Sequence, residues 1–339
     1  VAASVSILLE ELRSVASTCA CRTAVEKALL GIAERTSTTM ESILSQSKSH
    51  LTVLLEKPLQ TRHVLAQIQL VKFVDFCLIR SPSLIPLKDM SVQTSPGAFF
   101  NAVLLVAESD DNTVLNVETQ ENESLSTLRQ SCVKVLSTAL STPEFSKSDS
   151  SADIVAVRER ISTVLFTSLT SRNGDIVAIA KRGLVEVKPH MNKNTLKQSV
   201  SPILMNLQHL SKLTIPLLEA LEYLLELLAE WFSPTLGEKL LEHIKYWLEL
   251  DASAPSVPGQ IRKSPKDAKL IASIVNLFHL LPKLRDGKSD AKANEPKLTP
   301  FDFIKPLVRD VMAIEATMPP ESVYSEANSL YTVPLTKFL

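Results

Sequence analysis

Glycine is scarce in this chain, with 7 glycines among 339 residues, roughly a third of average usage. Tight turns, nucleotide-binding loops and multi-stranded sheets all draw on glycine, because it enters unusual backbone conformations more readily than other residues. The shortage therefore favours helices over sheets.

An excess of either charge is also lacking. Lys and Arg number 36 against 37 Asp and Glu, which leaves a formal net charge of -1. Nucleic-acid binders usually carry a basic surplus, so we expect no direct contact with nucleic acid. Balanced charge suits a surface that faces other proteins.

The chain begins at Val1 inside an apolar-periodic stretch, and we expect it to be a fragment of a longer protein.

Catalytic signatures are missing as well. Residues 287–289 resemble the end of a phosphate-binding loop, but Pro282 stands where that loop requires glycine. Two Arg-Asp pairs, at 285–286 and 309–310, lack the asparagine that follows in a kinase catalytic loop. The six histidines are scattered singly. We therefore expect no catalytic, cofactor-binding or metal-binding residues and no small-molecule substrate.

The cysteines predict no metal site either. Cys19 and Cys21 have the wrong spacing for a zinc knuckle. All four cysteines, Cys19, Cys21, Cys77 and Cys132, lie in apolar stretches with helical periodicity, where the thiol behaves as a small hydrophobe. This usage fits a reduced, intracellular compartment.

The clearest positive signal is a leucine-rich stretch at 213–250. Its leucines recur at the spacing of one helix face, namely Leu217, Leu218, Leu221, Leu224, Leu225 and Leu228. Glutamates at 219, 222, 226 and 230 take the opposite face, which excludes a membrane span. Ser233-Pro234 turns the chain into a second amphipathic helix. We predict a helical hairpin that Trp231, Phe232 and Trp247 hold together.

Apolar periodicity predicts helices along the whole chain. They are expected at 4–16, 21–33, 38–55, 61–80, 96–107, 124–141, 152–171, 174–187, 193–207, 215–232, 234–250, 265–281, 300–316 and 320–330. Three polar stretches, at 108–123, 251–264 and 284–297, are expected to be loops. From Ala152 on, helix pairs recur about every 40 residues, the period of HEAT and armadillo repeats.

One repeat is especially clear at 157–188. Its first helix is expected to bury Ile161, Val164, Leu165 and Leu169, and its second Ile176, Ile179, Ala180, Leu184 and Val185. Asn173, Gly174 and Asp175 form the turn and cap, and Asp175 with Arg182 matches the usual HEAT pattern. Each unit exposes an apolar flank that the next must cover. We predict an all-α fold, an α-α superhelix of HEAT/armadillo type that is one continuous region over residues 1–339.

Other patterns are open to two interpretations. Three matches to the LxxLL recognition pattern, at 51–55, 221–225 and 277–281, are interpreted as solenoid core, with helix-in-groove docking as the alternative. Basic residues at 262–269 beside Ser264-Pro265 are interpreted as a solvated loop. The alternatives are a phosphorylation-gated interaction loop or a localisation signal.

Several segments carry a family resemblance. The run WFSPTLGEKLL at 231–241 is the most specific, and SPILMNL at 201–207 and LTIPLL at 213–218 accompany it. Together with weaker similarity at 76–82 and 128–139, they resemble the helical-repeat region of the TRRAP-like (transformation/transcription domain-associated) family of PI3-kinase-related pseudokinases. The resemblance implies a non-catalytic scaffold of histone acetyltransferase co-activator complexes such as SAGA, which receives transcription-activator domains.

On this resemblance we expect a nuclear protein that regulates transcription by binding co-activator complex subunits and activator domains, without cofactor, membrane or enzymatic activity of its own. Two alternatives stay open. One is the helical-repeat region of an active PI3-kinase-related protein kinase. The other is a transport or phosphatase-scaffold solenoid.

Overall fold

The computed structural model describes residues 2–14, 19–57, 59–85, 87, 95–109, 119–146, 152–191, 200–201, 205, 214–228, 273, 276–277 and 280. Within these ranges the regular structure is helical throughout, as the sequence predicts, and no strand occurs there. The chain divides into two compact units, Val1–Ser199 and Val200–Leu339. Each unit is described by itself.

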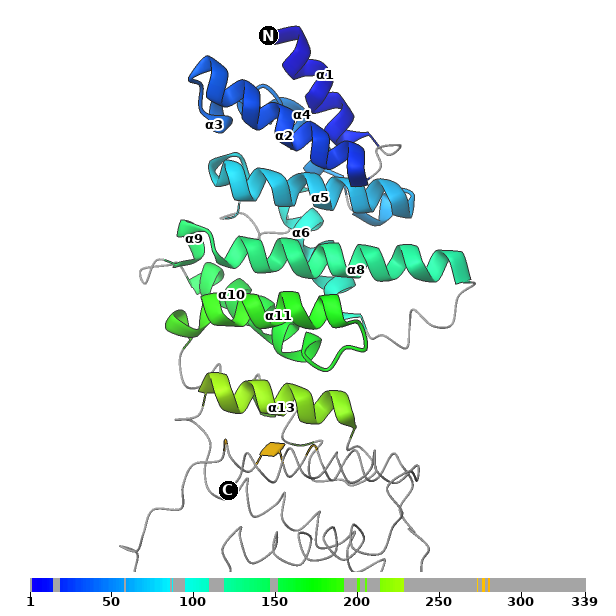
Figure 1. Ribbon diagram of the computed structural model, residues 1–339, viewed down its shortest axis with the longest axis vertical. Coiled ribbons are helices and arrows are strands. Elements are labelled where there is room, and N and C mark those ends of the chain that lie inside the picture. Colours follow the sequence, from blue (N-terminus) through cyan, green and yellow to red (C-terminus); the bar gives the residue numbers. More distant parts are fainter. Residues whose placement is uncertain are drawn as a thin grey trace, which may run out of the picture. The chain divides into compact units, whose positions relative to one another are not determined.

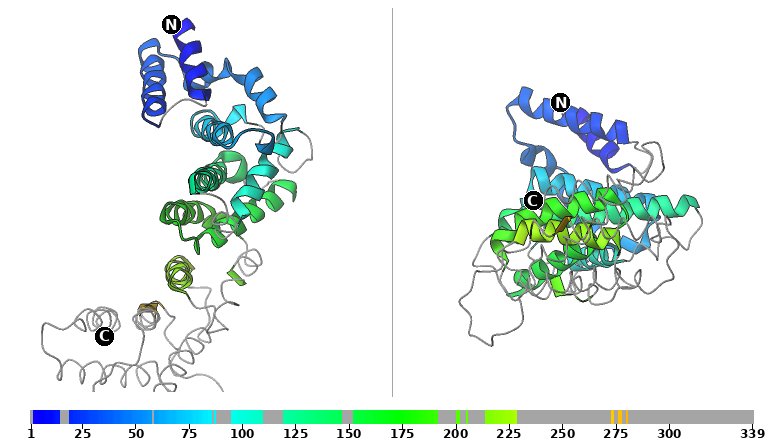
Figure 2. Two further views of the ribbon diagram at one scale, coloured as in Figure 1. Left: turned by 90° about the vertical axis from the view of Figure 1, so that its right-hand side faces the viewer. Right: turned by 60° about the horizontal axis from the view of Figure 1, so that its bottom comes forward.

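The first unit consists of helices in two rows. Its elements are α1 (Ala2–Arg13), α2 (Cys19–Thr36), α3 (Met40–Ser45), α4 (Lys48–Leu55), η1 (Leu59–Thr61), α5 (Val64–Arg80), η2 (Pro82–Leu84), α6 (Ser95–Glu108), α8 (Thr119–Leu140), α9 (Pro143–Ser146), α10 (Ala152–Ser168), α11 (Gly174–Val187) and η4 (Lys188–His190). Helix α5 packs on α8 and α8 packs on α11, which makes the front row in Figure 1. Behind it, α6 packs against both α4 and α10, and Figure 2 shows the two rows side by side.

The core of the first unit lies between these rows. Fully buried aromatic side chains come from both of them, Phe73 from α5 and Phe99, Phe100 and Phe166 from α6 and α10. Phe99 and Phe100 meet edge to face, with ring centroids 5.3 Å apart. Burial of each such side chain contributes about 1.5–3 kcal/mol to folding, so contact between the rows stabilises the first unit.

Several hydroxyl groups of α8 and α10 are satisfied inside their own helix. Ser131 donates to the carbonyl oxygen of Thr127 at 2.8 Å. Ser162 donates to Arg158 O at 2.7 Å, and Thr163 donates to Glu159 O at 3.0 Å. Bonds to the carbonyl one turn earlier let a hydroxyl enter a packed region without a partner on another helix.

The α10–α11 pair confirms most of the clearest predicted repeat. Helix α11 spans Gly174–Val187 as predicted, and the Asn173 side chain caps it by accepting the Asp175 N–H at 3.0 Å. The predicted burial of Val185 is wrong, because this side chain is 54% exposed. The buried stripe passes instead through Ala180, Gly183, Leu184 and Val187, so Val185 lies one step of about 100° beyond it.

Two predicted boundaries also differ. The helix expected at 38–55 is two helices, α3 and α4. Gln46 N–H and Ser47 N–H bond carbonyls three residues back, which tightens and ends α3. Helix α8 starts at Thr119 rather than at 124, so the end of the expected 108–123 loop is helical. The polar residues there lack apolar periodicity, yet carboxylates are favourable at a helix N-terminus.

The described part of the second unit is mainly α13 (Ile215–Leu228). All six leucines of the predicted stripe are buried, whereas Glu219 and Glu226 are exposed. Asn276 donates to the Glu222 carboxylate at 2.6 Å. Most of the remaining predictions lie outside the described residues, namely the helices at 193–207, 234–250, 265–281, 300–316 and 320–330, the loops at 251–264 and 284–297, and Trp231, Phe232 and Trp247.

Candidate functional site

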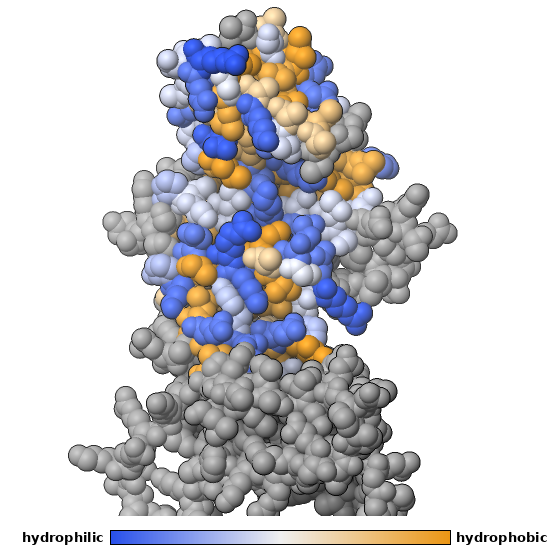
Figure 3. Space-filling view, viewed as in Figure 1, coloured by the Kyte–Doolittle hydropathy of each residue, from blue (hydrophilic) through white to orange (hydrophobic). Residues whose placement is uncertain are grey.

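A groove runs across the front row of the first unit. Its larger cavity, of about 420 Å³, lies between α5, α8 and α11, and its smaller one, of about 320 Å³, lies between α2, α5 and α8. Ile79 and Lys134 line both cavities, so we treat them together as the interhelical groove. On this face of the first unit, hydrophilic side chains surround smaller apolar patches (Figure 3).

A buried carboxylate forms the link between α5 and α8. Asp75 accepts the hydroxyl proton of Thr138 at 2.6 Å, and its other oxygen lies 3.0 Å from the Lys134 ammonium. The Asp75 side chain is 7% exposed, whereas that of Lys134 is 54% exposed. Because the carboxylate is out of water, it depends on these two partners, and loss of either leaves an uncompensated polar group.

Arg22 provides a second buried charge at the α2 end of the groove. Its guanidinium donates to Glu26 Oε1 at 3.1 Å, to Gln69 Oε1 at 3.1 Å and to the carbonyl of Leu12 at 3.2 Å. Its remaining nitrogen, Nη2, is buried and has no hydrogen-bond partner among the described residues. Burial lowers the pKa of Arg22, and the Glu26 carboxylate opposes that shift. A guanidinium still carries its charge at neutral pH.

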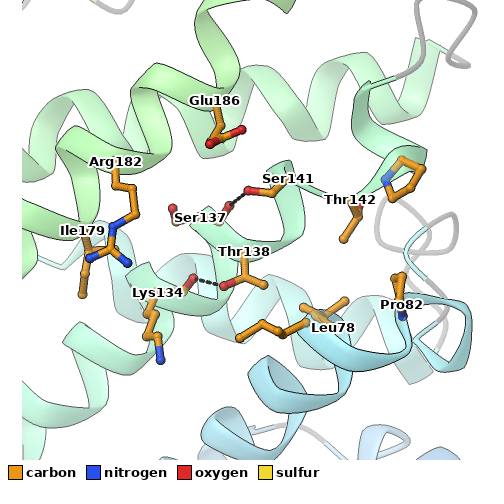
Figure 4. Close-up of a pocket in the computed structure, with 12 residues that line it drawn as sticks. Leu78, Pro82, Lys134, Ser137, Thr138, Ser141, Thr142, Ile179, Arg182 and Glu186 are labelled. Atoms are coloured by element: carbon orange, nitrogen blue, oxygen red, sulfur yellow. Dashed lines mark hydrogen bonds between the residues drawn. The ribbon is translucent and has the colours of Figure 1, made fainter. Parts of the chain in front are cut away.

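The α11 side of the groove carries two exposed charged groups. Figure 4 shows Glu186 of α11 pointing toward the hydroxyl-bearing residues Ser137 and Ser141, whereas Arg182 of the same helix extends beside Ile179. Arg182 was noted in the sequence for its HEAT pattern, and the structure gives it a place at the rim of the groove. Leu78 and Pro82 line the opposite wall. The groove thus combines cations, hydroxyls and apolar surface.

Helix α11 approaches α8 and α10 very closely at one point. A Cβ atom added at Gly183 would lie 2.6 Å from the Ser137 hydroxyl oxygen and 2.8 Å from a methyl carbon of Leu165. Both distances are too short for a real contact. Only glycine therefore fits at this position without a shift of the neighbouring side chains.

The cysteines separate into two kinds. Cys77 and Cys132 are 1% and 0% exposed. Burial raises the pKa of the Cys77 thiol to about 12 and also raises that of Cys132, so both stay protonated and unreactive. The prediction of a small buried hydrophobe is wrong for Cys21, which faces solvent on α2. The side chain of Cys19 lies outside the described residues.

The LxxLL match at 221–225 is confirmed as core, and the match at 51–55 is confirmed for two of its three leucines, since Leu54 is half-buried. Leu51 and Leu55 are 1% exposed, and Leu221, Leu224 and Leu225 are fully buried. Leu277 is buried too, whereas Leu281 and the basic residues at 262–269 lie outside the described part.

Across the described ranges no three His, Cys, Asp or Glu residues are placed to hold a metal ion. Likewise, none of the described helices has the length and apolar character of a membrane span.

Sequence reasoning did not find the groove. Its residues come from α2, α5, α8 and α11, with Pro82 of η2 and Pro143 of α9, and Ile79 and Arg182 are far apart in the chain. Ile79 carries the one available signal. It falls in a run of apolar residues at the end of α5, next to Arg80, where helical periodicity turns it toward solvent.

Comparison with known proteins finds several relatives that are much longer than this chain. It is 28% identical over 327 residues to the SAGA complex/NuA4 acetyltransferase complex subunit TRA1 of Saccharomyces cerevisiae, covering 94% of this chain and 8% of that protein. It is 30% identical over 257 residues to the probable transcription-associated protein 1 of Dictyostelium discoideum, covering 74% and 5%. The human transformation/transcription domain-associated protein is 23% identical over 329 residues, covering 89% and 8%.

The chain thus spans less than a tenth of the length of these relatives. A family model described as the Tra1 HEAT repeat ring region matches residues 1–339. This match agrees with the paired helices of the first unit and with the TRRAP-like resemblance of the sequence. The chain belongs to the Tra1 HEAT repeat ring family.

Proposed function

We propose that the chain is a scaffold region of a transcription co-activator subunit, acting in the nucleus as part of a histone acetyltransferase complex. The family match over residues 1–339 carries this proposal. The name of the Saccharomyces cerevisiae relative supports it, because that protein is described as a subunit of the SAGA and NuA4 acetyltransferase complexes. The proposal includes one continuous helical-repeat region over the whole chain.

The proposed mechanism is protein contact without catalysis. Helical repeats offer long, open surfaces on which other chains dock. The first unit supports this mechanism, because its front row carries exposed charged and apolar side chains around the interhelical groove. The proposed partners are subunits of the complex and transcription-activator domains. No site residue, cofactor or small-molecule substrate enters the mechanism.

Affinity purification tests the proposed assembly. The full-length protein that contains this region is tagged at its own locus and purified from nuclear extract, and the recovered proteins are quantified by mass spectrometry. We expect acetyltransferase-complex subunits in near-stoichiometric amounts. Recovery of transport factors or phosphatase subunits without acetyltransferase subunits contradicts the proposal and favours a transport or phosphatase-scaffold solenoid.

A separate measurement tests the absence of catalysis. The purified full-length protein is incubated with labelled ATP and a generic protein substrate, and phosphate transfer is counted. We expect no transfer above the level of a buffer control. Transfer by the protein, together with intact HRD and DFG motifs elsewhere in its sequence, would identify an active PI3-kinase-related kinase instead.

A further inference from the structure

The charges that line the interhelical groove do not cancel. Four cations and three carboxylates surround it. Arg22 is paired with Glu26 at 3.1 Å, and Lys134 with Asp75 at 3.0 Å. The cations that remain without an ion pair in the described part of the chain are Lys72 on α5 and Arg182 on α11. Glu186 is the remaining carboxylate, one helical turn from Arg182.

The two cations without an ion pair lie at different ends of the groove. Lys72 lines only the smaller cavity, and Arg182 lines only the larger one. Between them, in the part that both cavities share, lie Ile79, whose side chain is 52% exposed, and Lys134, whose charge is paired with Asp75. The groove therefore presents a positive charge, an apolar side chain and a second positive charge in order.

Hydroxyl groups along α8 complete the groove. Ser131 and Ser141 use their protons on carbonyl oxygens of their own helix, and Thr138 shares its proton between Asp75 and the Lys134 carbonyl. Each hydroxyl oxygen can still accept a hydrogen bond. This row of acceptors is suited to the backbone N–H groups of a chain that lies along the groove.

We propose that the interhelical groove binds an extended segment of a partner protein in which an apolar side chain is flanked on each side by a carboxylate. The apolar side chain packs on Ile79, and the carboxylates face Lys72 and Arg182. This proposal rests on the proposed scaffold function and specifies the chemistry of one partner.

Other ligand classes fit the groove less well. A nucleic-acid backbone needs a row of cations at phosphate spacing, whereas here Ile79 separates two cations and Glu186 stands beside one of them. A basic segment would be repelled by Lys72 and Arg182 and would find Asp75 and Glu26 already paired. Charge complementarity therefore selects an acidic segment.

Photo-crosslinking in the intact complex tests the proposal. The full-length protein carries p-benzoylphenylalanine in place of Ser141, an exposed residue at the α9 end of the groove. A second version carries it in place of Val53, which is 55% exposed on α4 and does not line the groove. After irradiation of the purified complex, mass spectrometry identifies the crosslinked peptides. We expect the groove position, but not the α4 position, to mark a segment with carboxylates on both sides of an apolar residue.

Charge reversal shows whether the cations hold that segment. We expect Lys72→Glu with Arg182→Glu to lower the crosslink yield at least tenfold. The matched control, Arg35→Glu with Lys48→Glu, makes the same charge change at exposed positions outside the groove and leaves the yield within twofold. Ile79→Ser is expected to lower the yield three- to tenfold, whereas Val53→Ser leaves it unchanged. Unaltered hydrogen exchange of α8 verifies that each variant is folded.

Three results would overturn the proposal. They are a crosslinked segment without carboxylates, an equal loss of yield in the control pair, and no groove crosslink from an intact complex. In the same purification, the recovery of acetyltransferase subunits reports on the proposed function independently. If those subunits are present and the groove crosslink fails, the groove proposal alone is wrong. If they are absent from every version, the scaffold assignment itself fails.

Discussion

The front row of the first unit contains two successive helix contacts that are built in different ways. Between α5 and α8, the buried Asp75 carboxylate bonds Lys134 and Thr138, and cavities remain on either side. Between α8 and α11, Gly183 lets the helices approach so closely that no Cβ atom fits. The first contact depends on charge and hydrogen bonding, and the second depends on shape.

This difference shows that one repeat architecture does not require one packing chemistry. Helix α8 takes part in both contacts, and residues about one turn apart on it, Ser137 and Lys134, face different neighbours. The α5–α8 contact is expected to fail when a charge is removed, and the α8–α11 contact when a single methyl group is added. The following substitutions test that contrast.

The largest effect is expected at Gly183. Gly183→Ala places a methyl group against Ser137 and Leu165, and the overpacking should lower the free energy of local unfolding by about 3 kcal/mol. Hydrogen exchange of α8 and α11 amides in the full-length protein measures it. Gly31→Ala is the matched control, since nothing lies within 4 Å of its added Cβ, and it should stabilise α2 by about 0.5–1 kcal/mol. Equal effects of the same sign at both glycines would refute the steric account.

The next largest effect is expected at the charged contact. Lys134→Met leaves the buried Asp75 carboxylate with only Thr138, and we expect a loss of about 2 kcal/mol in exchange protection of α5 and α8. The loss falls short of that for a fully buried pair, because the Lys134 side chain is 54% exposed. Adding Asp75→Leu should restore at least half of the protection. If the double variant is less stable than Lys134→Met, the carboxylate is not the cause.

A smaller effect is expected at the start of α11. Asn173→Ala removes the cap on the Asp175 N–H and the bond to the Ser126 hydroxyl at 3.2 Å, which should cost about 1 kcal/mol. Asn173→Asp keeps the cap but cannot donate to Ser126. The difference between the two variants in the exchange rates of the first α11 amides therefore measures the contribution of the cap, and the loss in Asn173→Asp measures that of the bond to Ser126 on α8. Equal losses would assign the whole effect to the Ser126 bond.

The smallest effect is expected for the polar link at the edge of the α8–α11 contact. Gln130 donates to the Asp175 carboxylate at 3.3 Å, and the bond is exposed. Gln130→Ala should change local stability by about 0.5 kcal/mol or less, as judged by the same exchange measurement. A loss comparable with that of Gly183→Ala would mean that hydrogen bonding, and not shape, holds α11 to α8.

Much of the fold was predictable because apolar spacing reports directly on burial. The bounds of α11 and the buried leucines of α13 follow from that spacing alone. The first turn of α8 was missed, because Thr119 and the polar residues after it have no apolar period. The break between α3 and α4 was missed too, because Ile43, Leu44 and Leu51 keep a helical spacing across it.

The candidate site could not be predicted from the sequence, for a different reason. Lys72, Ile79 and Arg182 are ordinary surface residues when each helix is considered alone. They form a groove only when α5, α8 and α11 are stacked in order. The ion pair between Asp75 and Lys134 likewise has no local sequence pattern that predicts it, since the two residues are on different helices.

The hydroxyl groups that bond within their own helix bear on how such a chain diverges. Ser162 makes no demand on an adjoining helix, so this position can change to an aliphatic residue of similar size without a matching change elsewhere. Asp75 and Lys134 do not have this freedom, because each needs the other. Repeats rich in hydroxyls that bond within their own helix can therefore accumulate substitutions one helix at a time, which fits relatives that are only 23–30% identical to this chain over the aligned residues.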